Sequence, residues 1–139
     1  MRDKIFLDSN IVLYLLSSDV AKAEKAEELL AAGATISVQV LNEVTNVARR
    51  KLAMSWPDVR TLLEAVRRHC RVEPLSVDSH ELGLRAAERY GLSVYDAMIV
   101  GSALAARCTQ LYSEDMQDGQ YIEQTLRITN PFHKTQPHI

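Results

Sequence analysis

Short apolar runs alternate along the chain with longer stretches in which apolar residues recur at helical spacing. Short strands are predicted at 5–7, 35–38, 110–112 and 126–128, and a short extended piece is predicted at 72–75. Helices are predicted at 11–16, 21–32 and 40–54, from 55 to about 70, from 78 to 91 and from 93 to 107. Strands that alternate with helices in this way predict an α/β fold, in which helices flank both faces of a short central parallel sheet and give three layers.

The composition is that of one globular domain of ordinary size. The chain has 139 residues, of which 47% are hydrophobic and 24% are charged, and this apolar content is enough to offset the entropy of the chain. We expect the folded domain to span residues 1–130. Residues 131–139 are expected to form a loose C-terminal tail, because Pro131 and Pro137 flank a mostly polar stretch there.

No stretch of the sequence predicts a membrane segment or a secretory signal. The longest charge-free run, 29–42, is interrupted by glycine and polar residues and is too short to span a bilayer. The two cysteines, Cys70 and Cys108, are too few for a disulfide scaffold and form no CxxC motif. Together these features predict a cytoplasmic protein with reduced thiols.

Charge limits how the chain could bind nucleic acid. The 16 Lys and Arg residues are outnumbered by 18 Asp and Glu residues, which gives a formal net charge of −2. Bulk charge therefore cannot hold a polyanion, and any nucleic-acid contact needs local basic patches or bound cations. The candidate patches are Arg49-Arg50-Lys51 and Arg67-Arg68, although such runs are also common on solvated helix faces.

Acidic residues follow two of the predicted strands. Asp8 comes directly after the strand at 5–7, and Asp115 comes shortly after the strand at 110–112, with Asp118 three residues later. In parallel α/β sheets, ligands bind beyond the carboxyl ends of the strands, so these acids are candidate site residues. Each also has a structural alternative, because Asp commonly caps helices and occupies turns.

Two further acids lie near the starts of predicted helices. Asp96 is in the first turn of a helix whose next ten residues carry no charge. That helix is expected to be buried, and a buried acid needs a cation or several hydrogen-bond donors. The alternative for Asp96 is a capping box with Ser93. Glu43 lies at the edge of an apolar helical arc, where it could face solvent or a cleft.

These carboxylates could converge at one end of the sheet. Two carboxylates ~5 Å apart repel by about 3 kcal/mol at an effective dielectric constant of about 20, and such a cluster is tolerated when divalent cations bind it. Oxygen ligands with retained water molecules suit Mg²⁺ or Mn²⁺. A cation bound there would lower the pKa of its water and stabilise charge on a phosphoryl group.

Four segments carry the candidate acids in a recognisable order and spacing. They are Phe6-Leu7-Asp8-Ser9-Asn10-Ile11-Val12, Asn42-Glu43, Leu92-Ser93-Val94-Tyr95-Asp96-Ala97-Met98-Ile99 and Leu111-Tyr112-Ser113-Glu114-Asp115-Met116-Gln117-Asp118-Gly119. In this order they resemble the motifs of the PIN-domain family, and most closely those of the VapC-type toxins of bacterial toxin–antitoxin pairs. The resemblance extends from Lys4 to about Asn130 and implies a PIN-like fold for that whole region.

The resemblance implies a metal-dependent endoribonuclease that acts as the toxin of such a pair. It assigns the catalytic acids of the family to Asp8, Glu43, Asp96 and Asp115. The implied ligands of Mg²⁺ or Mn²⁺ are Asp8, Asp96 and Asp115, with Asp118 at a position where some members add an acid. Water would cleave the RNA phosphodiester and leave a 5′-phosphate and a 3′-hydroxyl.

The same resemblance implies supporting residues and partners. Ser113 matches a small hydroxyl residue that would bond to a carboxylate or to a metal-bound water, and Asn10 is assigned a supporting role. The resemblance also implies a homodimer and a small antitoxin whose C-terminal segment crosses the active-site groove. Arg or Lys on that segment would pair with the acids, and the apolar helix at 11–16 would help to grip it.

Other functions are compatible with acids on a parallel sheet. Among nucleases, the alternative is a free-standing PIN-domain RNA-processing enzyme. A non-catalytic binding module is the alternative from another class, and its acids need not share a metal. A haloacid-dehalogenase-like phosphatase is rejected because Asn10 stands where its Asp-x-Asp pair needs a second acid. A phosphorylation receiver domain is disfavoured because Asp8 has no acidic neighbour.

Overall fold

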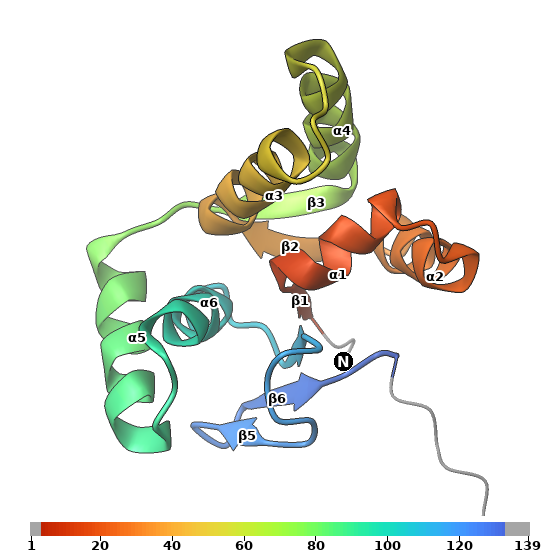
Figure 1. Ribbon diagram of the computed structural model, residues 1–139. Helices are drawn as coiled ribbons and strands as arrows, with labels where there is room; N and C mark the ends of the chain where they lie inside the picture. The colour runs from red at the N-terminus through yellow and green to blue at the C-terminus, as the bar shows by residue number, and fades with distance from the viewer. Residues whose placement is uncertain (1–3, 133–139) are drawn as a thin grey trace, which may run out of the picture.

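The computed structural model describes residues 4–132, which form a six-stranded sheet with flanking helices (Figure 1). The strands are β1 (Ile5–Leu7), β2 (Ala34–Ser37), β3 (Cys70–Glu73), β4 (Gln110–Tyr112), β5 (Tyr121–Ile122) and β6 (Leu126–Thr129). The helices are α1 (Ser9–Leu13), the 3₁₀ turn η1 (Tyr14–Leu16), α2 (Val20–Ala31), α3 (Val38–Arg50), α4 (Trp56–His69), α5 (Val77–Tyr90) and α6 (Val94–Ala105). None of these helices is long and apolar enough to cross a membrane.

The strand order places a topological reversal at the centre of the sheet. The order is β3-β2-β1-β4-β6-β5, and every neighbouring pair is parallel except β5 with β6. The chain proceeds outward from β1 through β2 to β3 and then returns to β4 on the other side of β1. Such a reversal leaves a crevice at the carboxyl ends of the two central strands, which is where open α/β sheets bind ligands.

Helices cover both faces of the sheet, as the alternation of strands and helices predicted. On one side α1 contacts α3, α3 contacts α4, and α4 contacts α2. The α5–α6 pair lies on the other side, with α6 next to the sheet (Figure 1). The predicted fold, a central and mostly parallel sheet flanked by helices, is confirmed.

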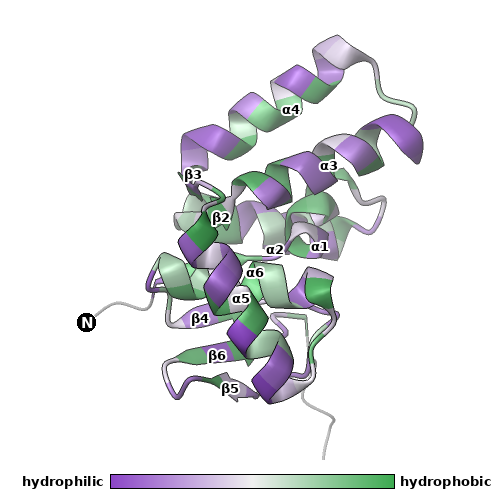
Figure 2. Cartoon of the chain, turned by 90° about the vertical axis from the view of Figure 1, so that its left-hand side faces the viewer, coloured by the Kyte–Doolittle hydropathy of each residue, from purple (hydrophilic) through white to green (hydrophobic). Residues whose placement is uncertain are grey.

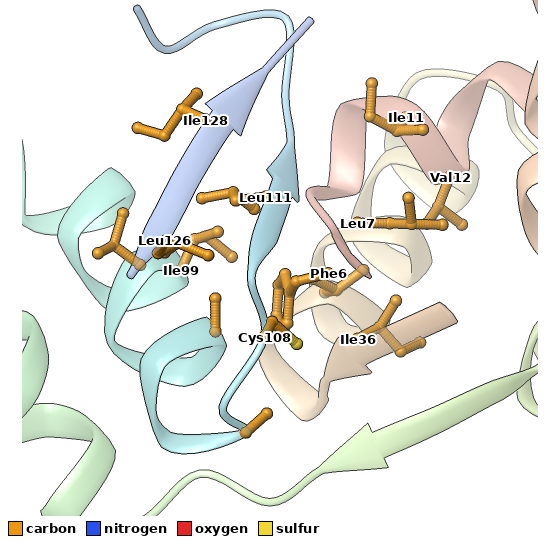
Figure 3. Packing of buried hydrophobic residues seen from close by; sticks show 14 of the residues in the cluster. Phe6, Leu7, Ile11, Val12, Ile36, Ile99, Cys108, Leu111, Leu126 and Ile128 are labelled. Atoms are coloured by element: carbon orange, nitrogen blue, oxygen red, sulfur yellow. The ribbon is translucent and has the colours of Figure 1, made fainter. Parts of the chain in front are cut away.

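The core is formed where the apolar strands meet the inner helices. Phe6 and Leu7 on β1 are almost fully buried, together with Ile36, Leu111 and Ile128 on neighbouring strands. Figure 3 shows these side chains packed around β1 and β4, with residues from α1 and α6 beside them. The continuous apolar run of β1 is therefore explained by its central position, which leaves neither face exposed to water.

Serine side chains begin four of the helices. The hydroxyls of Ser37, Ser55, Ser76 and Ser93 each accept a backbone N–H from the residue three positions later. Each cap satisfies a donor that the first helical turn leaves without a partner. The cap at Ser37 is also why α3 starts immediately after β2 and directs its first turns over the carboxyl end of the sheet.

Figure 2 shows α5 lying across α6, and two glycines allow the two helices to pack in direct backbone contact. A methyl group at Gly101 would lie 2.4 Å from the carbonyl oxygen of Ser79, and one at Gly83 would lie 2.8 Å from the terminal carbon of Met98. Both distances are shorter than van der Waals contact, so these positions require glycine. The part of α6 that follows Asp96 carries no charge and is mostly buried, as predicted.

Several predicted boundaries are wrong by a few residues. The helix predicted at 40–54 begins at Val38 and ends at Arg50, because Ser37 caps it and the chain turns at Ala53, whose φ is +50°. Cys70 begins β3 and does not end a helix. The segment 11–16 is divided between α1 and the 3₁₀ turn, and α6 ends before 107.

The antiparallel strand β5 was not predicted. It pairs with β6 through a tight turn in which Glu123 and Gln124 both have positive φ, and the N–H of Thr125 donates to the carbonyl of Ile122 at 3.2 Å. Turns of this kind usually carry Asn or Gly, so Glu-Gln gives no sequence signal for a hairpin.

Most of the predicted C-terminal tail, residues 133–139, lies outside the described residues. At its start, the ring of Phe132 packs edge-on against the ring of Tyr14, with 4.9 Å between the ring centroids.

Candidate active site

Asp8 lies at the reversal point of the sheet, directly after β1. It is buried, and its Oδ1 accepts the N–H of Ser9 at 2.7 Å while its Oδ2 accepts the hydroxyl of Ser113 at 2.8 Å. Burial raises the pKa of Asp8 to about 6, and the nearby charges of Glu43 and Asp115 act in the same direction. Asp8 therefore caps α1 and also places a desolvated carboxylate at the base of the crevice.

Ser113 connects Asp8 to the loop that carries Asp115. Its side chain is fully buried after β4, donates to Asp8, and accepts the backbone N–H of Asp115 at 3.2 Å. One hydroxyl thus bridges the end of β1 and the first turn after β4. The structure places the Ser113 hydroxyl against the Asp8 carboxylate, and its supporting role in catalysis stays a prediction.

Glu43 faces the crevice from the second turn of α3. Its Oε2 accepts the hydroxyl of Ser9, and its Oε1 accepts the side-chain amide of Gln39 at 3.2 Å. The hydroxyl of Tyr95 also hydrogen-bonds with Glu43. Of the two orientations that the sequence left open, the structure shows the one toward the cleft.

Three residues around Glu43 were given no role in the sequence analysis. Gln39 could have been found from its spacing, because residues four apart on a helix are neighbours. Ser9 and Tyr95 are each adjacent in sequence to a candidate acid, but their link to Glu43 joins segments that are distant along the chain. No local pattern predicts such contacts.

Asp96 lies in the first turn of α6 and is partly buried. Its backbone N–H donates to the hydroxyl of Ser93 at 3.2 Å, and the Ser93 side chain also bonds to its carboxyl group. Burial raises the pKa of Asp96, with further contributions from the charges of Asp115 and Glu43. The helix-capping interpretation is therefore correct for Ser93, and Asp96 is at the same time within electrostatic reach of the other acids.

Asp115 and Asp118 lie on the exposed loop after β4. Asp115 contributes to the raised pKa of both Asp8 and Asp96, which places it near those two carboxylates. Asp118 has a different contact, because its Oδ1 accepts the backbone N–H of Asn130 at 2.9 Å. The structure thus brings Asp8, Glu43, Asp96 and Asp115 into one electrostatic cluster, whereas Asp118 faces the end of β6.

Asn10 follows Ser9 on α1, and its side-chain amide is buried without a hydrogen-bond partner among the described residues. This applies to both the amide nitrogen and the amide oxygen. Buried amides normally have partners. The supporting role assigned to Asn10 stays a prediction.

The residues at this site have the chemistry of a hard-cation site, although they are not arranged as a closed set of ligands. Within residues 4–132, no three His, Cys, Asp or Glu side chains lie close enough to hold one metal ion together. The available donors are carboxylate and hydroxyl oxygens, and the carboxylates repel one another. Oxygen donors of this kind fit Mg²⁺ or Mn²⁺ and not Zn²⁺, which favours nitrogen and sulfur.

A cavity of about 370 Å³ opens beside the carboxylates. It lies between α1, α3 and the start of α6, and its lining residues are Ser9, Leu13, Gln39, Asn42, Glu43, Asn46, Val47 and Tyr95. A second cavity of about 450 Å³ lies between α3, α5 and α6, and Gln39 is the residue that lines both. Glu43 is the clustered acid that lines the first cavity, so the cluster is open on its Glu43 side to a ligand much larger than a metal ion.

Comparison with known proteins assigns the chain to a family. A model of the PIN domain matches residues 5–117, a range that contains every clustered acid. The chain belongs to the PIN-domain family. Among curated proteins, the sequence comparison finds no match.

Similar solved structures support the same PIN fold. A chain of a toxin–antitoxin complex from Klebsiella pneumoniae has a TM-score of 0.72 and 21% identity, with 94% of this chain and 100% of that chain covered. VapC20 of Mycobacterium tuberculosis, a Sarcin-Ricin loop cleaving toxin, has a TM-score of 0.60 and 21% identity, with 79% of this chain and 88% of that chain covered. A chain of VapBC2 from Rickettsia felis, solved with a promoter DNA fragment, has a TM-score of 0.64 and 19% identity, with 91% of this chain and 98% of that chain covered.

Proposed function

We propose that this PIN-domain protein is a metal-dependent endoribonuclease and acts as the toxin of a toxin–antitoxin pair. The observation that carries the proposal is the cluster of Asp8, Glu43, Asp96 and Asp115, which come from four separate segments and meet at the reversal point of the sheet. Membership of the PIN family and the toxins among the similar structures support it.

In this proposal the acids of the site have different roles. Asp8, Asp96 and Asp115 would hold Mg²⁺ or Mn²⁺, and Asp118 would act further out. The cation, when bound, supplies positive charge for the phosphoryl oxygens and lowers the pKa of a water molecule. Glu43 would accept a proton from the attacking water, and its hydrogen bonds with Ser9 and Gln39, which orient its carboxylate, support this role.

The remaining residues position these groups. Ser113 fixes the direction of the Asp8 carboxylate and ties it to the loop of Asp115. No side chain is proposed as a nucleophile, and the products are a 5′-phosphate and a 3′-hydroxyl. The acids repel one another when no cation is bound, so the empty site favours binding of positive charge.

The same electrostatics suggest how the enzyme is silenced. An antitoxin segment bearing Arg or Lys would pair with the carboxylates and exclude the cation. Leu13 and Val47 line the neighbouring cavity and offer apolar contacts for such a segment. A homodimer and a cytoplasmic location, where cellular RNA is found, belong to the proposal as well.

The direct test compares the wild type with Asp96→Asn, which removes one charge and keeps the shape of the side chain. Cleavage of labelled RNA is expected with Mg²⁺ or Mn²⁺ and is expected to stop in excess EDTA. The Asp96→Asn protein should fold and lose activity by orders of magnitude. Cleavage that continues in EDTA would exclude the metal mechanism, and unfolding of Asp96→Asn would show that the residue is mainly structural.

A cellular experiment separates the toxin from the two alternatives. Expression of the wild type alone should arrest bacterial growth, and co-expression of the neighbouring small gene should restore it. A free-standing RNA-processing nuclease would cut RNA but would not be neutralised by that neighbour. A non-catalytic binding module would show no metal-dependent cleavage. Sequencing of RNA ends after brief expression would identify the substrate.

A further inference from the structure

A polar stripe runs along α3 away from the acid cluster. Gln39, Asn42, Glu43, Asn46 and Arg50 recur every three or four residues, so they lie on one face of the helix. The first four line the cavity of about 370 Å³, and Arg50 is one turn beyond it. At 1.5 Å per residue the stripe is about 16 Å long, with carboxylate near one end and a cation at the other.

Arg50 differs from its neighbour Arg49 in what surrounds it. The Arg49 guanidinium donates to the carbonyl of Met54 at 2.6 Å and lies 4.4 Å from the ring centroid of Trp56. The Arg50 side chain is exposed and, among the residues that the structure describes, forms no ion pair and no hydrogen bond. Arg49 therefore stabilises the α3–α4 turn, whereas Arg50 is available to a ligand.

The groups along this groove match single-stranded RNA. The amides of Asn42 and Asn46 are exposed and offer both donors and acceptors, which can bond to the edges of unpaired bases. The ring of Tyr95 is 55% exposed at the groove and offers a face on which a base can stack. Arg50 supplies the local positive charge that a protein with a net charge of −2 needs to hold a phosphate.

Charge also favours RNA over a basic peptide at the Arg50 end of this groove. A segment bearing Arg or Lys is attracted to the carboxylates, but it meets a like charge where the stripe ends at Arg50. An RNA strand fits both ends of the stripe. Its phosphates are attracted to Arg50, and a divalent cation bound at the cleavage site would offset their repulsion by the acids. The stripe is therefore complementary to RNA along its whole length once a cation is bound.

We propose that the α3 groove, formed by Asn42, Asn46, Val47 and Tyr95 and continued by Arg50, holds the RNA strand on one side of the cleaved bond. Arg50 pairs with a backbone phosphate, and the two asparagines bond to base edges. This assignment rests on the proposed nuclease function and adds the surface that positions the substrate.

The test measures RNA binding in an Asp96→Asn background, so that the RNA stays intact. Fluorescent single-stranded oligo(U) and oligo(A) are titrated in the presence of Mg²⁺ over a range of salt concentrations. Arg50→Gln should weaken binding of both RNAs several-fold and lower the magnitude of the slope of log K against log salt by about 0.7, the value for one lost phosphate contact. Asn46→Ala should change the ratio of the two affinities and leave the slope unchanged.

Arg85→Gln is the matched control. It removes the same charge from an exposed position on α5, where Arg85 lies beside Asp78 and Glu81 at a separate cavity, and it should bind RNA like the background protein. Equal binding and equal slopes for Arg50→Gln and Arg85→Gln would overturn the proposal. So would an Arg50→Gln defect that is seen with the antitoxin and not with RNA, because the groove would then belong to the protein partner.

Failure of this inference can be distinguished from failure of the proposed function. If the wild type cuts RNA and binding does not depend on Arg50, only the groove assignment is wrong. If the wild type does not cut RNA and binding still depends on Arg50, the groove assignment stands and the nuclease proposal is wrong.

Discussion

The carboxylate site has an inner half and an outer half that are built in different ways. The inner half, Asp8 with its partners Ser9 and Ser113, lies at the ends of β1 and β4 and is buried. The outer half, the loop with Asp115 and Asp118, is exposed to solvent. The fold therefore fixes the inner carboxylate before any ligand arrives, while the outer acids lie on a solvent-exposed loop, where Asp118 accepts the backbone N–H of Asn130.

Fixing the inner carboxylate has an electrostatic cost. Hydrogen bonds from Ser9 and Ser113 stabilise the charged form of Asp8, yet burial dominates and raises its pKa to about 6. A cation bound at the site would offset this desolvation directly. Burial therefore destabilises the charged form of Asp8 in the metal-free protein, whereas solvent reaches the acids of the outer half.

The largest expected effect is that of Asp8→Asn. Activity should fall by orders of magnitude, because the variant loses the innermost proposed cation ligand. The metal-free variant should still fold, since Asn caps helices as well as Asp does. Its free energy of unfolding near pH 7 should exceed that of the wild type by up to about 3 kcal/mol. RNA cleavage assays and urea unfolding in EDTA measure the two effects.

The same variant should change how stability depends on pH. The folded-state pKa of Asp8, about 6, exceeds the unfolded value of about 3.9. Between these values the folded protein keeps the proton that the unfolded chain has lost, so wild-type stability should decrease as pH rises from about 4 to about 6 and then level off. Asp8→Asn should remove most of this decrease and Asp115→Asn should keep it. The same decrease in all three proteins would contradict the comparison.

Ser113→Ala tests the link between the two halves and should have an intermediate effect. The variant loses the hydroxyl that donates to Asp8 and accepts from the N–H of Asp115. Loss of a group that orients a metal ligand typically costs 10- to 100-fold in affinity or activity, and we expect a decrease of about that size in Mg²⁺ affinity and in RNA cleavage. The free energy of unfolding should decrease by about 1–2 kcal/mol.

Ser102→Ala is the matched control for this experiment. Ser102 is also a buried serine, on α6, but its hydroxyl has no hydrogen-bond partner within residues 4–132. Its removal should leave RNA cleavage and Mg²⁺ affinity unchanged. A similar loss of activity in both variants would show that buried hydroxyls matter here through packing and not through the link between the halves.

The inner half could be predicted from sequence more completely than its surroundings. Asp8 and Ser113 directly follow short apolar strands, and a parallel sheet brings such positions to one edge. The link from Ser9 to Glu43 spans 34 residues, so it depends on how α3 packs over α1. The periodicity of apolar residues predicts which face of a helix is buried. It does not predict which side chain lies opposite that face across the crevice.

The outer half was the harder part to predict, because its backbone depends on contacts without a sequence signal. The turn with positive φ at Glu123 and Gln124 creates β5 without Asn or Gly. Asp118 accepts a bond from Asn130, a partner twelve residues away at the end of β6. The family resemblance suggested a metal-site role for Asp118, which stays a prediction; the contact observed for Asp118 supports the backbone.

The smallest expected effect separates the two outer acids. Asp118→Asn keeps an oxygen that can accept the N–H of Asn130, so stability should change by no more than about 0.5 kcal/mol and RNA cleavage should remain near that of the wild type. Asp115→Asn should reduce cleavage at least about tenfold, since it removes the charge that reaches both Asp8 and Asp96. Mg²⁺ titrations of cleavage would measure this difference. Equal losses in the two variants would place Asp118 beside Asp115 in holding the cation, and the outer half would then supply two ligands to the inner half's one.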